Sequence, residues 1–226
     1  MHPVRTLLAL SLLAAAPAFA TTGLDAGDIA AAEGLRERAM RGSEAWNVVE
    51  SLTTEVGPRL AGTEADARAV RWAEAKFRAM GFDKVYLEPV TFPVWLRHHE
   101  RAEVLAPYPQ PLVVTALGGS VGTGDTPVEA EVVAFASLDA LKAAPEGSLD
   151  GKIAVITNRM VRFKDGRGYG PAVGARSQGA VEAARKGAVA VLIRSIGTSS
   201  DRFAHTGTMR YVADVPRIPA AALSNP

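Results

Sequence analysis

The chain has 226 residues, of which 48% are hydrophobic and 22% are charged, a composition typical of a globular protein with a buried core. Its 25 basic side chains nearly balance its 24 acidic ones and are scattered along the sequence, which argues against a nucleic-acid groove and against a surface for anionic membranes. The sequence has no cysteine, and this excludes disulfides, thiolate nucleophiles and zinc sites with Cys ligands.

The first twenty residues have the pattern of a secretory signal peptide. His2 and Arg5 give a weakly basic start, residues 7–16 are almost wholly apolar, and residues 18–20 form the A-x-A cleavage site Ala-Phe-Ala. The apolar stretch is shorter than the roughly 20 residues of a membrane-spanning helix, and no later segment is long and apolar enough to span a bilayer. We therefore expect residues 1–20 to be removed and the mature protein to be exported, as a periplasmic or secreted protein.

Two helices are expected at the start of the mature chain. Residues 21–42 should begin as a flexible stretch and continue as a helix over residues 29–41, which Gly42 ends. Ser43 has the character of an N-cap, and apolar residues at helical spacing follow it as far as Val56.

The clearest helix runs from an N-cap at Thr63 to a glycine stop at Gly81. Its apolar side chains fall on one face, so we expect that face to be buried and Phe77→Ala to cost about 3–5 kcal/mol of unfolding free energy. A strand over residues 84–90 should follow the helix, with Pro89 suited to an edge or a strand end. The residues of the apolar face are Val70, Ala73, Phe77 and Met80.

From residue 102 onward, short β-type segments alternate with turn residues, which indicates a β-rich module. Apolar runs over residues 153–157 and 188–193 flank a short helix over residues 178–186. Such a strand–helix–strand unit predicts two adjacent parallel strands joined by a right-handed crossover, so the fold class is expected to be α/β. The other expected elements are strands over residues 102–106, 112–117, 128–133 and 218–223 and a helix over residues 138–144.

The histidines do not form a metal-binding pattern. Once the signal segment is removed, only His98, His99 and His205 remain. Neighbours such as His98 and His99 point to opposite faces of a strand, and the sequence contains neither H-E-x-x-H nor H-x-D. We therefore expect no metal ligand on this chain.

Residues 118–122 match the nucleophile motif G-x-S-x-G, with Ser120 at its centre. In a hydrolase of that type the serine follows a strand and opens a helix. Here Thr-Gly-Asp-Thr-Pro follows, and this sequence does not start a helix, so a glycine-rich turn between strands is the favoured interpretation.

A second glycine-rich segment contains Gly166, Gly168, Gly170 and Gly174. Basic residues surround it, so a phosphate cradle is one interpretation. The P-loop ending Gly-Lys-Ser/Thr is missing and no strand runs directly into the glycines, which favours a flexible surface loop. The basic residues are Arg162, Lys164, Arg167 and Arg176.

A candidate contact surface follows the second strand of the crossover, because clefts in α/β sheets form at the carboxyl ends of strands. Polar residues of this strand end and of the loop beyond it would suit an anionic or peptidic ligand, and a solvated loop is the alternative. The candidate contact residues are Arg194, Ser195, His205, Thr206, Arg210 and Tyr211.

Several segments, in the same order, resemble carboxypeptidase Q-like and bacterial aminopeptidase-like dizinc exopeptidases. The resemblance covers about residues 43–226. The segments are residues 52–63, LTTEVGPRLAGT, and 80–82 for the opening of the peptidase core, 168–176 and 187–195 for a protease-associated domain, and 205–207 and 218–221 for the exit from that domain.

The resemblance implies a zinc exopeptidase α/β core interrupted by an inserted β-rich protease-associated domain. It implies a peptidase part over residues 43–108, the insert over residues 109–216 and a return strand over residues 217–226. Two zinc ions would activate a water that hydrolyses the terminal bond of a peptide or dipeptide. The ligands and the catalytic glutamate of such enzymes come after the insert, so we expect no catalytic residue here, a truncated chain that is inactive alone, and an open sheet edge near residues 220–223.

Two other functions stay open from the sequence. The chain could be an exported, non-catalytic protease-associated module that only binds a substrate or partner. It could also be a serine hydrolase built on Ser120. Neither the preference for amino- or carboxy-terminal bonds nor the oligomeric state follows from the residues.

Overall fold

A computed structural model describes residues 23–226 of the protein, and the expected signal peptide lies outside these residues. The chain divides into two compact units between Thr91 and Phe92, whereas the resemblance placed a boundary between residues 108 and 109. Across residues 23–226, no helix combines the length and the apolar character needed to cross a membrane.

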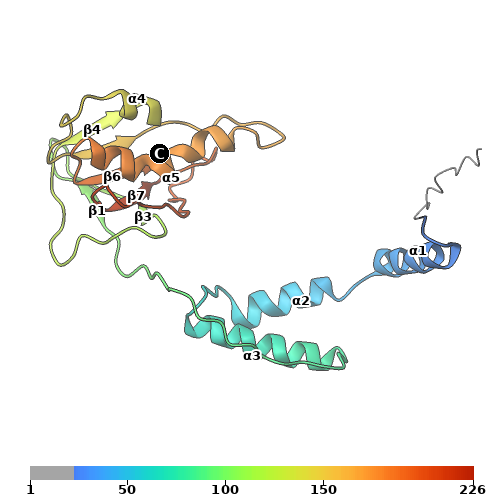
Figure 1. Ribbon diagram of the computed structural model, residues 1–226. Helices are drawn as coiled ribbons and strands as arrows, with labels where there is room; N and C mark the ends of the chain where they lie inside the picture. The colour runs from blue at the N-terminus through green and yellow to red at the C-terminus, as the bar shows by residue number, and fades with distance from the viewer. Residues whose placement is uncertain (1–22) are drawn as a thin grey trace, which may run out of the picture. The chain divides into compact units, whose positions relative to one another are not determined.

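The first unit is helical, with α1 (Ala26–Arg41), α2 (Ala45–Ser51), the π-helical turn η1 (Leu52–Val56) and α3 (Glu64–Ala79) (Figure 1). Thr63 caps α3 by accepting a hydrogen bond from the Asp66 amide at 3.3 Å, and the Asp66 carboxylate accepts one from the Gly62 amide at 2.9 Å. This reciprocal pair satisfies two amide donors at the start of α3, which explains why the N-terminus of this helix was readable from the sequence.

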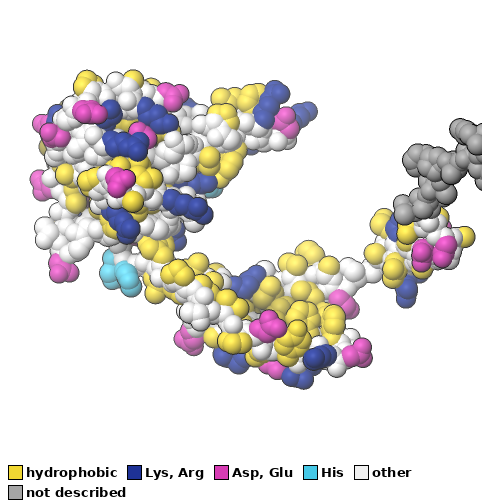
Figure 2. All heavy atoms as spheres, in the orientation of Figure 1, with side chains coloured by type: hydrophobic (Ala, Val, Ile, Leu, Met, Phe, Trp, Pro, Cys, Tyr) yellow, Lys and Arg dark blue, Asp and Glu magenta, His cyan; other side chains and the backbone are white. Residues whose placement is uncertain are grey.

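The prediction that the apolar face of α3 is buried is wrong for the part of the chain that the structure describes. Phe77 is 47% exposed and Val70 is 42% exposed, and α3 has no buried residue. Hydrophobic side chains are accordingly visible on the surface of α2 and α3 (Figure 2). Among residues 23–226, the aromatic partner of Phe77 is Phe82, whose ring meets it edge-on at 5.3 Å.

The strand expected over residues 84–90 does not form in the structure. Residues 83–101 are extended without a strand partner. A β-strand requires a neighbouring backbone to complete its hydrogen bonds, so β-type residues alone do not make one.

The second unit is a mixed α/β structure with two sheets. A small antiparallel sheet pairs β1 (Ala102–Val104) with β2 (Gln110–Leu112). The main sheet has five strands in the order β3-β7-β6-β5-β4, in which β3 is antiparallel to β7 and the other neighbours are parallel. Its strands are β3 (Val114–Ala116), β4 (Val132–Phe135), β5 (Ile153–Ile156), β6 (Ala190–Arg194) and β7 (Ala220–Leu223).

The adjacency of β5 and β6 confirms the parallel pair expected from the crossover, with Ile156 paired to Ile193. The helices α4 (Leu138–Ala143) and α5 (Tyr169–Arg185) contact each other, and α5 also contacts both strands. Side chains from alternate positions of the strands form the core under α5, and Ile156, Val191 and Ile193 are almost fully buried there.

Helix α5 is much longer than the expected helix over residues 178–186, because it begins at Tyr169 and includes glycines that were interpreted as part of a loop. A Cβ atom at Gly179 would lie 3.0 Å from Ile156 Cδ1, and one at Gly174 would lie 3.2 Å from Leu138 Cδ2. These glycines therefore let α5 approach the sheet and α4 closely, and packing outweighs their low helix propensity.

The expected open edge near residues 220–223 is absent from the described sheet. Strand β7 pairs with β6 on one side and with β3 on the other, and Ala220 and Ala222 are buried. The segment expected to return to a peptidase core is thus an inner strand of the second unit's own sheet.

Candidate functional site

Three of the six candidate contact residues use their polar atoms to hold the loop beyond β6 against the sheet. Ser195 is fully buried, where its hydroxyl donates to the Leu223 carbonyl and accepts from the His205 amide at 2.7 Å. A side chain sealed inside the fold cannot touch a ligand, so the contact role expected for Ser195 is wrong.

Thr206 and Tyr211 continue this attachment. Thr206 Oγ1 donates to the Ala116 carbonyl at 2.7 Å and accepts from the Arg97 guanidinium at 2.7 Å. Tyr211 Oη donates to the Ile218 carbonyl at 2.6 Å and accepts from the Val121 amide at 3.0 Å. Each hydroxyl therefore donates one hydrogen bond to protein and accepts one from it, and these bonds fix the path of the loop.

Arg194, His205 and Arg210 are the remaining candidates, and within residues 23–226 their side chains make no hydrogen bond to protein. His205 and Arg210 are exposed, and His205 meets the Phe203 ring edge-on at 5.8 Å. The Arg194 guanidinium is half-buried, and its pKa is lowered by this burial and, to a smaller extent, by the charge of Arg159. The site therefore offers cations at the carboxyl ends of β5 and β6, and the sequence reading missed Arg159.

Ser120 does not have the surroundings of a nucleophile. Its hydroxyl donates to the Val121 carbonyl at 2.8 Å and accepts from the Ala220 amide at 2.8 Å, so its partners are backbone groups and not a histidine base. The segment after it contains no helix, and Ser120 itself is only 7% exposed. The serine-hydrolase interpretation is wrong, and Ser120 joins β7 to the turn after β3.

The described histidines and carboxylates do not converge on a possible metal ion. Within residues 23–226, no three or more His, Asp or Glu side chains lie close enough together to hold one. His98 and His99 are exposed and lie in an extended segment outside any strand.

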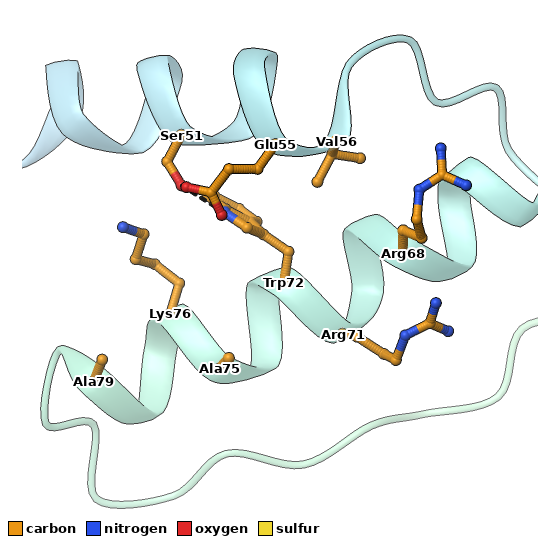
Figure 3. A pocket seen from close by; sticks show the side chains of 9 residues that line it. All are labelled: Ser51, Glu55, Val56, Arg68, Arg71, Trp72, Ala75, Lys76 and Ala79. Carbon is orange, nitrogen blue, oxygen red and sulfur yellow. Dashed lines mark hydrogen bonds between the residues drawn. The ribbon is translucent and has the colours of Figure 1, made fainter.

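The first unit contains an open groove of about 580 Å³ between η1 and α3 (Figure 3). Trp72 Nε1 donates to Ser51 Oγ at 2.8 Å, and Ser51 Oγ donates to a Glu55 carboxylate oxygen at 2.6 Å. The Lys76 ammonium lies 5.9 Å from the centre of the Trp72 ring. The residues that line the groove are Ser51, Glu55, Val56, Arg68, Arg71, Trp72, Ala75, Lys76 and Ala79.

This groove was not anticipated because the sequence reading placed these residues on two separate α-helices. The π-helical turn puts Glu55 beside Trp72, and only Trp72, an aromatic residue among charged ones in an amphipathic helix, could have signalled it. The lining contains three basic side chains and one carboxylate, and Arg68 is also 3.7 Å from the Glu64 carboxylate outside the groove.

The sequence is similar to carboxypeptidase Q of vertebrates. The protein from Bos taurus is 37% identical over 174 residues, which are 76% of this chain and 35% of that protein. The protein from Xenopus laevis is 39% identical over 169 residues, which are 75% of this chain and 34% of that protein. The chain thus spans about a third of the length of these relatives, and no protein-family model matches it.

The fold is similar to that of a solved peptidase. The crystal structure of a Peptidase M28 precursor from Shewanella amazonensis SB2B superimposes with a TM-score of 0.80 and is 55% identical. The match covers 88% of this chain and 46% of the Shewanella chain.

Proposed function

Since this chain is carboxypeptidase Q-like and M28 peptidase-like over most of its length, we propose that it is the N-terminal portion of an exopeptidase that hydrolyses terminal peptide bonds. The observation that carries the proposal is the Shewanella match, which combines 55% identity with a TM-score of 0.80 over 88% of the chain. Identity at that level over 88% of the chain is far more specific than a shared fold.

The proposed chemistry depends on two zinc ions and a metal-activated water. Residues 23–226 do not fit such a site, because they bring no three His, Asp or Glu side chains together. We derive no step of the hydrolysis from these residues. In this proposal they supply scaffold and substrate contacts, and the metal ligands and the catalytic glutamate belong to a longer product.

We further propose that the second unit corresponds to a protease-associated domain inserted into the peptidase core. The mixed sheet with α4 and α5 on β4, β5 and β6 supports this assignment, as does the resemblance of residues 168–176 and 187–195. The proposed product is exported after removal of residues 1–20, to the periplasm or the medium, and acts on peptides or dipeptides. Its oligomeric state is open.

A second candidate is an exported binding module without catalysis. This second function is favoured by the lack of a metal-holding group and of a serine nucleophile within residues 23–226. The same observation shows no catalytic residue for the exopeptidase function in this part of the chain. Peptide binding by the full chain without turnover would distinguish this function from the first.

The product isolated from its native host provides the test. It should release terminal residues from an unblocked peptide and lose this activity with a zinc chelator. Peptides blocked at either the amino or the carboxyl end will identify which terminus it uses. Intact mass will show whether residues 1–20 are present. Hydrolysis that resists chelation, or a native product without hydrolysis, would contradict the exopeptidase proposal.

A further inference from the structure

The loop between β5 and α5 concentrates positive charge in a chain that is nearly neutral overall. Residues 157–168 contain four basic side chains and only one acidic side chain, Asp165. In Figure 2, dark blue side chains gather at the tip of the loop that leads into α5. The basic residues of the loop are Arg159, Arg162, Lys164 and Arg167.

Two arginines follow the paired residues of neighbouring parallel strands at the carboxyl edge of the main sheet. Arg159 follows the end of β5, Arg194 ends the neighbouring parallel strand β6, and the charge of Arg159 contributes to the lowered pKa of Arg194. Over residues 23–226, neither arginine forms an ion pair. Arg159 is exposed and Arg194 is partly buried, and a bound anion would relieve the repulsion between their like charges.

Arg159 also lines a cavity of about 520 Å³ at the carboxyl ends of β4 and β5. Arg167 lines it as well, with its guanidinium 4.2 Å from the centre of the Phe163 ring and 3.9 Å from the Asp165 carboxylate. The guanidinium thus stacks on an aromatic ring, while its side chain is 68% exposed and free to meet a ligand.

The loop that carries these arginines is closed at its base. A Cβ atom at Gly168 would lie 1.9 Å from the Val161 carbonyl oxygen, so only glycine permits this approach of the two loop ends. Gly168 is the N-cap of α5, and the first turn of this helix carries no acidic side chain. The positive end of α5 therefore adds to the field of the arginines, and the nearby Asp165 carboxylate, which accepts a hydrogen bond from the Arg167 amide at 3.2 Å, offsets part of it.

The rest of the cavity wall is mixed. Val161, Phe163 and Pro171 provide an apolar surface, and Asn158 provides a neutral amide. Asp139 is the one carboxylate among the lining residues. A concave site with an apolar wall and two cations fits a small ligand with one anionic end better than it fits the flat surface of an acidic protein.

We propose that this cavity binds the anionic group of a small organic ligand, a carboxylate or a phosphate, between Arg159 and Arg167, with the apolar part of the ligand against Phe163 and Val161. Guanidinium groups match both anions because each can form paired hydrogen bonds with them. The proposal does not depend on the peptidase function, so the failure of either leaves the other standing.

The test uses the full chain and three probes that share a phenyl ring, titrated by isothermal calorimetry. The probes are phenyl phosphate, N-acetylphenylalanine and the uncharged N-acetylphenylalanine amide. At least one anion should bind saturably and the amide should not, and the tighter anion identifies the preferred group. Equal binding of the amide, or no saturable binding of either anion, would overturn the proposal.

Variants then locate the site. Arg159→Gln should weaken binding of the preferred anion about tenfold, because it removes a charged hydrogen-bond donor from the cavity. Arg162→Gln makes the same charge change in the same loop but outside the cavity lining, and should weaken binding less than about twofold. Equal weakening by both variants would mean that the loop attracts anions only diffusely, and the proposal would be wrong.

A third variant does not depend on loss of binding. Asp139→Asn removes the only carboxylate of the lining, so the anion should bind several-fold more tightly. A misfolded protein would not show tighter binding. Unchanged or weaker affinity in this variant would contradict the placement of the anion in this cavity.

Discussion

Ser195→Ala tests whether the buried serine beyond β6 is a structural residue rather than a ligand contact. The substitution removes the acceptor of the His205 amide hydrogen bond, at 2.7 Å, and a donor to the Leu223 carbonyl. The Leu223 carbonyl keeps the bond from the Ser195 amide at 2.9 Å, so its loss is partial. With about 1–2 kcal/mol for the stranded amide and about 1 kcal/mol for the carbonyl, we expect a loss of about 2–3 kcal/mol of unfolding free energy.

The measurement should report on the second unit by itself, because a chain of two units need not unfold in one step. Native-state hydrogen exchange of the β6 and β7 amides gives the local free energy of opening. The matched control is Ser199→Ala, which removes an exposed hydroxyl from the same loop and should change this free energy by less than about 0.5 kcal/mol.

Two results would refute the reasoning. If the β6 and β7 amides of the Ser195→Ala variant exchange as fast as those of the wild type, the buried hydroxyl makes no net contribution to stability. The hydrogen bonds described above would then not hold the loop. If Ser199→Ala is destabilised as much as Ser195→Ala, the loop responds to any change, and the effect cannot be assigned to the buried hydrogen bonds.

Three further predictions follow from individual positions. Gly187→Ala should cost more than about 2 kcal/mol in urea unfolding, because φ is +93° there and the new Cβ would lie 1.8 Å from an Asp150 carboxylate oxygen; a smaller cost would mean that Asp150 moves freely. Phe77→Ala in this chain should cost less than about 2 kcal/mol, because the ring is 47% exposed; a cost of 3–5 kcal/mol would show that the ring is buried after all. Ser120→Ala should lower the melting temperature by several degrees, because it removes the acceptor of the Ala220 amide hydrogen bond. It should leave kcat of any hydrolysis by the native product unchanged; a lower kcat in a fully folded variant would support Ser120 as the nucleophile.

The elements that the sequence predicted well are those whose signals are local. Helix α3 is preceded by its N-cap, Thr63, and followed by Gly81, which has a positive φ, so both of its ends are marked by neighbouring residues in the sequence. Strands β5 and β6 are short apolar runs with a helix between them, and the rule for parallel crossovers then fixes their adjacency.

The start of α5 was missed because its glycines have low helix propensity, and the reason for them lies across the fold. Gly179 leaves room for the side chain of Ile156, and Gly174 leaves room for that of Leu138. These contacts are between residues far apart in the sequence, so no local pattern predicts them. The failure at residues 84–90 and at Phe77 has the opposite origin, since β propensity and an apolar face each require a partner surface that residues 23–226 do not provide.

The candidate contact surface was predicted only in part, for a similar reason. Polar residue types in a loop are the same whether they face a ligand or the backbone. The acceptor of the Ser195 hydroxyl is 28 residues away, and the Tyr211 hydroxyl reaches Val121 across 90 residues. The contact role of Arg194 stays a prediction. Its side chain makes no hydrogen bond or ion pair within residues 23–226, and the charge of Arg159, which the sequence does not link to it, contributes to its lowered pKa.

The position of β7 between β3 and β6 has a consequence for how the second unit is made. Strands β4, β5 and β6 follow one another along the chain and can pair as they emerge from the ribosome. Strand β3 is synthesised before these strands, but within the described sheet it pairs with β7, which follows them in the sequence. Val114 therefore cannot pair with Leu223 until β7 has been synthesised. Long-range pairing of this kind is slow, and until it occurs the backbone edges of β3 and β6 are both free to pair with another molecule. In the time between synthesis of β6 and docking of β7, these two free edges expose the second unit to aggregation.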